Sequence, residues 1–109
     1  MNRGDVVLVV LPKELGKPRP AVVLQADVFN TKAESFTVCP ITSTIVDGPL
    51  ARPTVDPTPG NGLRKVSQIM VDKLGPTARR RIRQTIGRLD DLTMIRVSRA
   101  AALWLGLAD

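Results

Sequence analysis

Proline divides most of this chain into segments that suit only strands and loops. Nine prolines are spread over 109 residues, and each removes a backbone N–H and fixes φ, which interrupts helices and central strands alike. Two stretches rich in Pro and Gly, residues 12–20 and 47–62, are predicted to be loops, with only residues 52–55 extended. Short apolar or alternating runs between these breaks predict strands at residues 6–11, 21–25, 35–39, 65–71 and 83–89.

The hydrophobic period changes near the C-terminal end. Asp90 or Asp91 can cap a helix that Gly106 would end, with Arg96 and Arg99 on its polar side. Its apolar face is predicted to hold Met94, Val97, Ala101, Trp104 and Leu105. Strands in series before one helix predict a mainly β fold: a small antiparallel barrel or curled sheet with the helix packed on it, as a single domain over residues 1–109. A core of this size is modest, so a second copy would help to stabilise it.

Missing residue types exclude several classes of enzyme. The chain contains no His and one Cys, Cys39, which rules out Ser-His-Asp and Cys-His nucleophilic sites, His-ligated zinc and an internal disulfide. Cys39 is interpreted as a small buried apolar residue in a cytoplasmic protein. The aspartates show no paired spacing for a metal, so we expect neither metal nor cofactor. No apolar run approaches the roughly 20 residues of a membrane span.

Positive charge is concentrated in the second half of the chain. The formal net charge is +6, and between Arg64 and Arg88 eight Lys and Arg residues accompany a single acid, Asp72. Such a cluster attracts phosphate backbones, although a solvated basic surface is the alternative interpretation. Three scattered aromatic residues are too few to stack bases. If this protein binds nucleic acid, it does so mainly through charge and backbone shape.

Two places could carry phosphate chemistry. Arg19 lies between Pro18 and Pro20, which hold its backbone extended and lower the entropic cost of presenting its planar fork to a phosphate. Three hydroxyls follow Pro40 and Ile41 at residues 42–44, where they could bind a phosphate oxygen or simply cap a turn. An exposed arginine on a stiff turn is the structural alternative for Arg19.

Four blocks of this sequence, in order, resemble one toxin family. They are residues 3–7 (RGDVV), 16–25 (GKPRPAVVLQ), 40–43 (PITS) and 62–73 (GLRKVSQIMVDK), and the ending from Ile86 to Leu107 is also similar. The chain thus resembles the MazF/PemK toxins of bacterial type II toxin-antitoxin systems. The resemblance implies an SH3-like barrel of the CcdB/PemK toxin type that forms a homodimer, arrests growth, pairs with an acidic antitoxin and binds DNA together with it.

The same resemblance implies a sequence-specific endoribonuclease that cleaves single-stranded RNA without metal. Its catalytic positions fall on Arg19 and Thr42, and the ribose 2′-hydroxyl of the RNA is the nucleophile, leaving a 2′,3′-cyclic phosphate and a 5′-hydroxyl. An internal nucleophile agrees with a chain that has no His. Residues expected to contact RNA are Lys17, Ser43, Arg64, Lys65, Ser67 and Gln68. Met70 stands where many members have a basic residue.

Two other functions remain open at this level. The related CcdB toxins poison DNA gyrase and end in an apolar helix with a Trp-Gly tail, similar to residues 104–106, but they lack the Arg-Pro motif found at Arg19. The position of Trp104 on the predicted apolar face favours a core role instead. A barrel that binds nucleic acid without cleaving it is the third interpretation.

Overall fold

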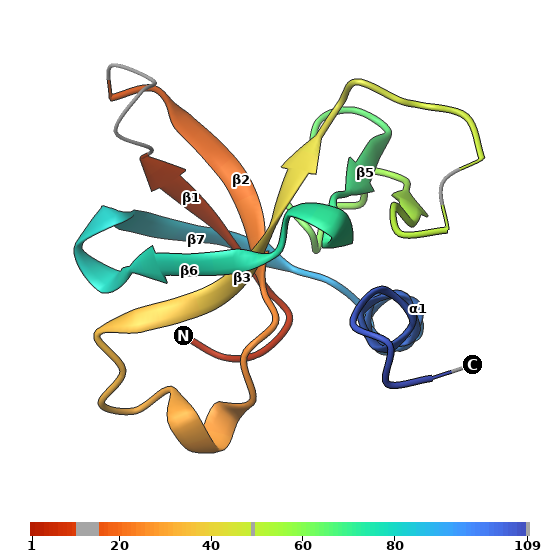
Figure 1. Ribbon diagram of the computed structural model, residues 1–109. Coiled ribbons are helices and arrows are strands. Elements are labelled where there is room, and N and C mark those ends of the chain that lie inside the picture. Colours follow the sequence, from red (N-terminus) through yellow and green to blue (C-terminus); the bar gives the residue numbers. More distant parts are fainter. Residues whose placement is uncertain (11–15, 49, 109) are drawn as a thin grey trace.

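The computed structural model describes residues 1–10, 16–48 and 50–108 and shows a curled sheet with one helix against it (Figure 1). The strands are β1 (Asp5–Val10), β2 (Pro18–Val23), β3 (Ser35–Thr42), β4 (Thr54–Val55), β5 (Ser67–Ile69), β6 (Gly75–Ala78) and β7 (Ile82–Arg88). Three short 3-10 turns, η2 (Asp27–Phe29), η3 (Val71–Lys73) and η4 (Arg79–Arg81), precede the helix α1 (Asp91–Trp104). The predicted mainly β fold with a C-terminal helix is therefore confirmed. None of the helices in these ranges is long and apolar enough to cross a membrane.

The long strand β3 organises the sheet. All strand pairs are antiparallel, and the order is β4-β5-β3-β2-β1-β7. β3 pairs with β2 along one edge; along the other, its first half pairs with β6 and its end pairs with β5. The sheet consequently branches along β3, where β6 and β5 share one edge.

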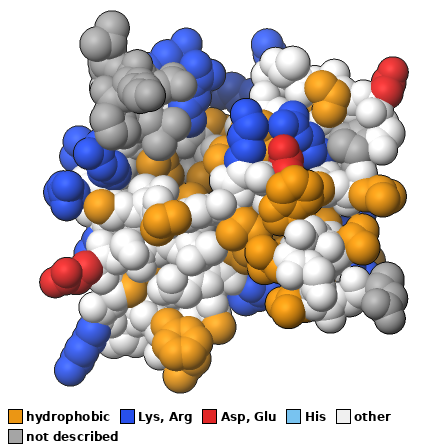
Figure 2. Space-filling view, viewed as in Figure 1, with side chains coloured by type: hydrophobic (Ala, Val, Ile, Leu, Met, Phe, Trp, Pro, Cys, Tyr) orange, Lys and Arg blue, Asp and Glu red, His pale blue; other side chains and the backbone are white. Residues whose placement is uncertain are grey.

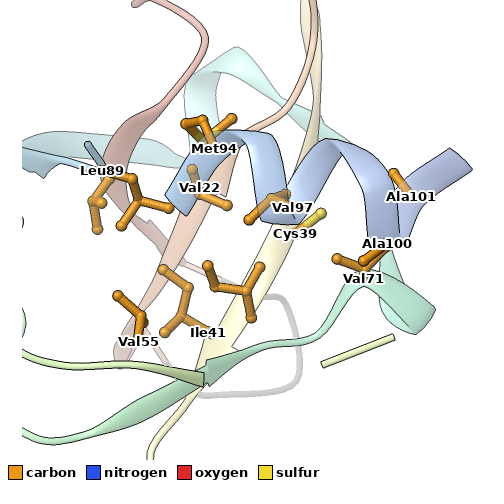
Figure 3. Close-up of a cluster of buried hydrophobic side chains, with 12 residues drawn as sticks. Val22, Cys39, Ile41, Val55, Val71, Leu89, Met94, Val97, Ala100 and Ala101 are labelled. Atoms are coloured by element: carbon orange, nitrogen blue, oxygen red, sulfur yellow. The ribbon is translucent and has the colours of Figure 1, made fainter. Parts of the chain in front are cut away.

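Consecutive apolar residues in β1 and β2 are explained by burial on both faces of the sheet. Side chains alternate along a strand, so Val6 and Val22 join one buried cluster while Val7 and Val23 join the other. The first cluster lies beneath α1 and includes Cys39, Ile41, Val71 and Val97 (Figure 3). The second surrounds Phe36. Cys39 is fully buried, as predicted, and burial raises the pKa of its thiol to about 12.

The ends of α1 match the sequence prediction, but its last turn does not. The Asp90 side chain accepts a hydrogen bond from the Thr93 amide at 2.7 Å, and Gly106 has φ +74° where the chain leaves the helix. Trp104 and Leu105 were expected in the core, yet each is 54% exposed. The apolar cluster under the helix ends with Ala100 and Ala101, so the final turn extends beyond it.

Two further predictions about strands were wrong. Residues 18–20 were assigned to a loop but form the start of β2. Pro18 and Pro20 are two residues apart, so the amide hydrogens they lack would both lie on the same edge of the strand. Arg19 between them still pairs with Val9. The strand β6 was missed because Gly75 and Pro76 carry no strand pattern. Of the rest of the predicted loop, residues 16–17 are outside any strand, as predicted, and residues 12–15 lie outside the described residues, as does Leu11.

Candidate active site

A hollow of about 590 Å³ lies where β1, β2, β3 and β7 meet the segment before β5. Its apolar lining includes Leu8, Pro20, Ile41 and Ile86. Its polar lining comes from Arg19, Thr42, Ser43, Thr44, Arg64, Lys65, Ser67 and Gln84. Six of the eight residues that the sequence assigned to catalysis or RNA binding thus gather in one place: Arg19, Thr42, Ser43, Arg64, Lys65 and Ser67.

Strand pairing accounts for Arg19 and Thr42 lining one hollow. β2 and β3 pair from Val23 opposite Val38 to Ala21 opposite Pro40. Arg19 precedes this paired stretch by two residues and Thr42 follows it by two, so both lie where β2 and β3 open onto the hollow. The Thr42 Oγ1 accepts a hydrogen bond from the Thr44 amide at 3.1 Å, which orders the turn of hydroxyls that follows β3.

Arg64 and Lys65 are carried by a loop that is anchored to β7. The Asn61 side chain is buried, accepts hydrogen bonds from the amides of Thr58 and Leu63 at 3.0 Å each, and donates to the Asp56 carbonyl at 2.9 Å. These bonds close the loop on itself and fix where it leads into the hollow.

Two glycines allow this loop to touch β7. A Cβ on Gly87 would lie 2.4 Å from the Asn61 carbonyl carbon, and one on Gly62 would lie 2.3 Å from the Ile86 oxygen. Gly62 also has φ +72°, a region that L side chains rarely adopt. The bulge or close approach predicted at Gly87 is therefore confirmed, and the register of β7 against β1 also shifts beside it.

Ser67 and Gln68 occupy structural positions in the wall of the site. Ser67 is buried and its hydroxyl donates to the Lys65 carbonyl at 2.9 Å. Gln68 is 2% exposed, and its carboxamide is bonded to Val46: Nε2 donates to the Val46 carbonyl at 2.9 Å, and Oε1 accepts from the Val46 amide at 3.1 Å. Because Gln68 is buried, its carboxamide could contact RNA only if the surrounding wall moved.

The segment after β3 is held at a second point by an ion pair. Arg52 Nε and Nη2 donate to the two carboxylate oxygens of Asp72 at 2.9 and 3.0 Å. Hydrogen bonding from Arg52 is the main reason that the pKa of Asp72 is lowered. Together with Gln68, this pair fixes the chain that runs from the hydroxyl turn to β4.

The charges of the hollow favour an anion. Arg19, Arg64 and Lys65 belong to its lining, and all three are exposed. The described lining contains no Asp, Glu or Cys, and the described residues hold no cluster of His, Cys, Asp or Glu that could bind a metal. A fixed cation beside hydroxyl groups can bind a phosphate and stabilise charge that develops on it.

The hollow contains residues that the sequence interpretation did not name, and two of the predicted RNA contacts lie outside its lining. Gln84, on β7, lines the hollow, and Leu8 and Ile86 contribute to its apolar lining. The sequence of β7 gives no signal for Gln84, because alternation would place it on the same face as Ile82 and Ile86. Lys17 is exposed directly before Pro18 and is not in the lining. Gln68 is likewise outside it.

Comparison with known proteins gives concordant results. A family model described as "PemK-like, MazF-like toxin of type II toxin-antitoxin system" matches residues 2–105. The chain is 39% identical over 109 residues to the "Probable endoribonuclease MazF" of Mycolicibacterium smegmatis, with 99% of both chains covered.

Solved structures agree on the fold. An endoribonuclease from a mycobacterial species, in complex with its cognate antitoxin, has a TM-score of 0.85 at 17% identity, with coverage of 100% of this chain and 98% of that one. The Mycobacterium tuberculosis toxin MazF-mt6 has a TM-score of 0.81 at 25% identity, with coverage of 96% and 99%. These likenesses confirm the predicted fold class.

Proposed function

Because the chain belongs to the PemK-like, MazF-like toxins of type II toxin-antitoxin systems, we propose that it is a sequence-specific endoribonuclease that cleaves single-stranded RNA without a metal ion. One observation carries this proposal: Arg19 and Thr42 belong to the same hollow, whose described lining supplies three cations and no carboxylate. The M. smegmatis relative, named a probable endoribonuclease, supports the same activity.

The proposed reaction uses the RNA's own ribose as nucleophile. The 2′-oxygen forms a bond to the adjacent phosphorus and loses its proton to solvent, while the bond from phosphorus to the 5′-oxygen breaks and that oxygen takes up a proton. The products are a 2′,3′-cyclic phosphate and a 5′-hydroxyl. Arg19 stays protonated, so its role is to stabilise the extra negative charge on the five-coordinate phosphorus. Thr42 orients the phosphate or the 2′-hydroxyl.

The remaining polar residues divide into contacts and supports. Lys17, Ser43, Arg64 and Lys65 are proposed to bind the RNA, because all four are exposed in or beside the hollow. Ser67 and Gln68, first expected to contact RNA, are proposed to hold the wall through their bonds to backbone groups. Lysine and arginine contacts to phosphate supply affinity, while base contacts supply sequence preference.

The experiment compares wild type with Arg19→Ala on a mixed single-stranded RNA in excess EDTA. Wild type should cut at defined sites, and Arg19→Ala should lose at least about 100-fold in rate, the order expected for removal of one charge-stabilising group. Lys32→Ala is the matched control, because Lys32 is exposed in the turn before β3 and lies outside the hollow. Intact RNA with wild type, or cleavage that appears only with added metal, would contradict the proposal.

We propose that the toxin acts in the cytoplasm as a homodimer. Figure 2 shows apolar side chains gathered over the side of the molecule that carries α1, where Leu50 is 81% exposed and Trp104 54% exposed. A second copy would remove such side chains from water. Sedimentation at micromolar concentration tests the dimer, and a single monomeric species would contradict it.

We also propose that an acidic antitoxin blocks RNA by occupying the basic hollow and binds DNA together with the toxin. The net charge of +6 supports an acidic partner, and the mycobacterial relative was solved with its cognate antitoxin. Addition of the cognate antitoxin should stop cleavage at stoichiometric amounts. Cleavage that continues in the bound complex would contradict this model.

Gyrase poisoning remains a second candidate because of one observation. Trp104 is exposed at the end of α1, so the argument that it belongs to the core no longer holds. Arg19 and the family match favour RNA cleavage. Trapping of cleaved DNA by gyrase in the presence of this protein would reverse that ranking.

A further inference from the structure

The arginines of the second half of the chain differ in what they contact. Arg79 donates to the carbonyls of Ala33 and Asn30 and lies 5.0 Å from the centre of the Phe36 ring. Arg88 pairs with Asp5, and Arg96 donates to the Thr54 carbonyl. These three guanidinium groups therefore hold the fold together.

Arg80, Arg81 and Arg83 make no such contacts. Among the described residues, none of the three takes part in an ion pair or a side-chain hydrogen bond. Arg80 and Arg83 are exposed and Arg81 is half-buried. All three lie in or beside η4, at the turn between β6 and β7, and we call them the arginine turn. Figure 2 shows blue side chains projecting at the left, where Figure 1 places this turn.

Strand register places the arginine turn beside the candidate active site. Val9 of β1 pairs with Arg19 on one edge and with Ile82 on the other, so Arg19 and Ile82 lie on either side of the same residue. Neighbouring strands are about 4.8 Å apart, which puts Ile82 about 10 Å from Arg19 across the sheet. Arg81 and Arg83 adjoin Ile82, and Gln84, one residue further, lines the hollow.

We propose that the arginine turn is an auxiliary RNA site, in which Arg80, Arg81 and Arg83 bind backbone phosphates of nucleotides that flank the segment held in the hollow. Arginine suits this role because its guanidinium stays charged and matches the geometry of phosphate oxygens. The proposal rests on the proposed endoribonuclease function, and it adds a second contact region that raises affinity for longer RNA.

The surroundings of the turn favour a nucleic acid over a protein partner. Protein interfaces need an apolar centre as well as charge. None of the large exposed apolar side chains of the described chain belongs to the turn itself; the pair Val28 and Phe29 lies in the segment that Arg79 bonds to through Asn30 and Ala33. A phosphate backbone needs only accessible positive charge. The three arginines of the turn offer charge with no large exposed apolar side chain between them.

The test uses the triple variant Arg80→Gln, Arg81→Gln and Arg83→Gln on two RNAs. One is a short RNA that spans only the mapped cleavage site, and the other is extended on both sides. The KM for the extended RNA should rise on the order of tenfold, with kcat unchanged and the short RNA cleaved as by wild type. With a non-cleavable extended RNA, the slope of log K against log salt should fall by about 2, because each phosphate contact on a single strand contributes about 0.7.

Two controls separate the possible results. The triple Lys32→Gln, Lys73→Gln and Arg99→Gln removes three exposed charges elsewhere and should leave both the KM and the salt slope as in wild type. The single variants Arg80→Gln and Arg83→Gln should each give about a third of the slope change, and they carry the test if the triple variant unfolds.

Each outcome decides between two ideas. If wild type cleaves neither RNA, the proposed function fails. If wild type cleaves both and the two triple variants behave alike, the auxiliary site fails while the function stands. Loss of affinity for the acidic antitoxin with RNA binding unchanged would also overturn the auxiliary site.

Discussion

At the scale of single residues, the candidate site combines contacts that sequence reveals with contacts that only folding creates. Arg19 stands out in the sequence because two prolines flank it, and the fold places it in the same hollow as Thr42. Gln68 gives no such signal. In the sequence it resembles an outward polar residue, whereas in the structure it is buried against Val46, 22 positions earlier. A pattern of period two shows which face a residue takes, but not which distant backbone it meets.

The role of Gln68 can be tested directly. Gln68→Ala removes both bonds to Val46 and should lower the free energy of unfolding by about 1–3 kcal/mol, seen as a lower Tm in thermal unfolding. Gln68→Glu keeps an acceptor for the Val46 amide but sets a carboxylate against the Val46 carbonyl, so it should also be destabilised. A direct RNA contact would give the opposite result: weaker RNA binding with Tm unchanged in Gln68→Ala.

At the scale of elements, the sequence predicted the strands that carry runs of strand-forming residues and the helix that has conventional caps. β1, β3, β7 and α1 carry clear patterns and match their predicted positions to within a few residues. β6 carries none, because Gly75 and Pro76 open it and its pairing with β3 alone defines it. The start of β2 was missed for a related reason. Proline can occupy a strand where its missing amide hydrogen is not needed for pairing, but in the sequence such a proline looks the same as one in a loop.

The contact between β7 and the loop of Asn61 gives an element-scale prediction. Gly87→Ala would put a Cβ 2.4 Å from a backbone atom of Asn61, so the loop that carries Arg64 and Lys65 must shift. We expect a loss of about 1–3 kcal/mol in the free energy of unfolding, measured by urea denaturation, together with weaker RNA binding.

Gly75→Ala is the matched control, because the nearest atom to its new Cβ is 4.0 Å away. Equal stability of the two alanine variants would show that the loop can move away from β7 without a loss of stability and does not hold Arg64 and Lys65 in place.

At the scale of the whole molecule, the basic residues behind the net charge of +6 have different roles. Some arginines, such as Arg52 and Arg79, bond to groups within the fold, while others surround the hollow or form the arginine turn. The charge of the sequence indicated a partner with phosphate groups, but it could not show which cations are bonded within the fold and which line the hollow or form the arginine turn. Only the three-dimensional contacts show which charges are committed to the fold.

The absence of His from the whole chain bears on which group can act as the nucleophile. The chain has no imidazole to activate the hydroxyls of the hollow, and burial raises the pKa of its one thiol to about 12. This agrees with the proposal that the ribose of the substrate supplies the nucleophile, with Arg19 as the fixed cation beside it.

The most direct measurement compares two RNA oligonucleotides in excess EDTA that share one mapped cleavage site. They differ only at the ribose on the 5′ side of the scissile phosphate, which lacks its 2′-hydroxyl in the second. The account predicts that the first is cut to a fragment ending in a 2′,3′-cyclic phosphate, while the second binds with similar affinity and stays intact. Cleavage of the 2′-deoxy oligonucleotide at the same position would contradict it.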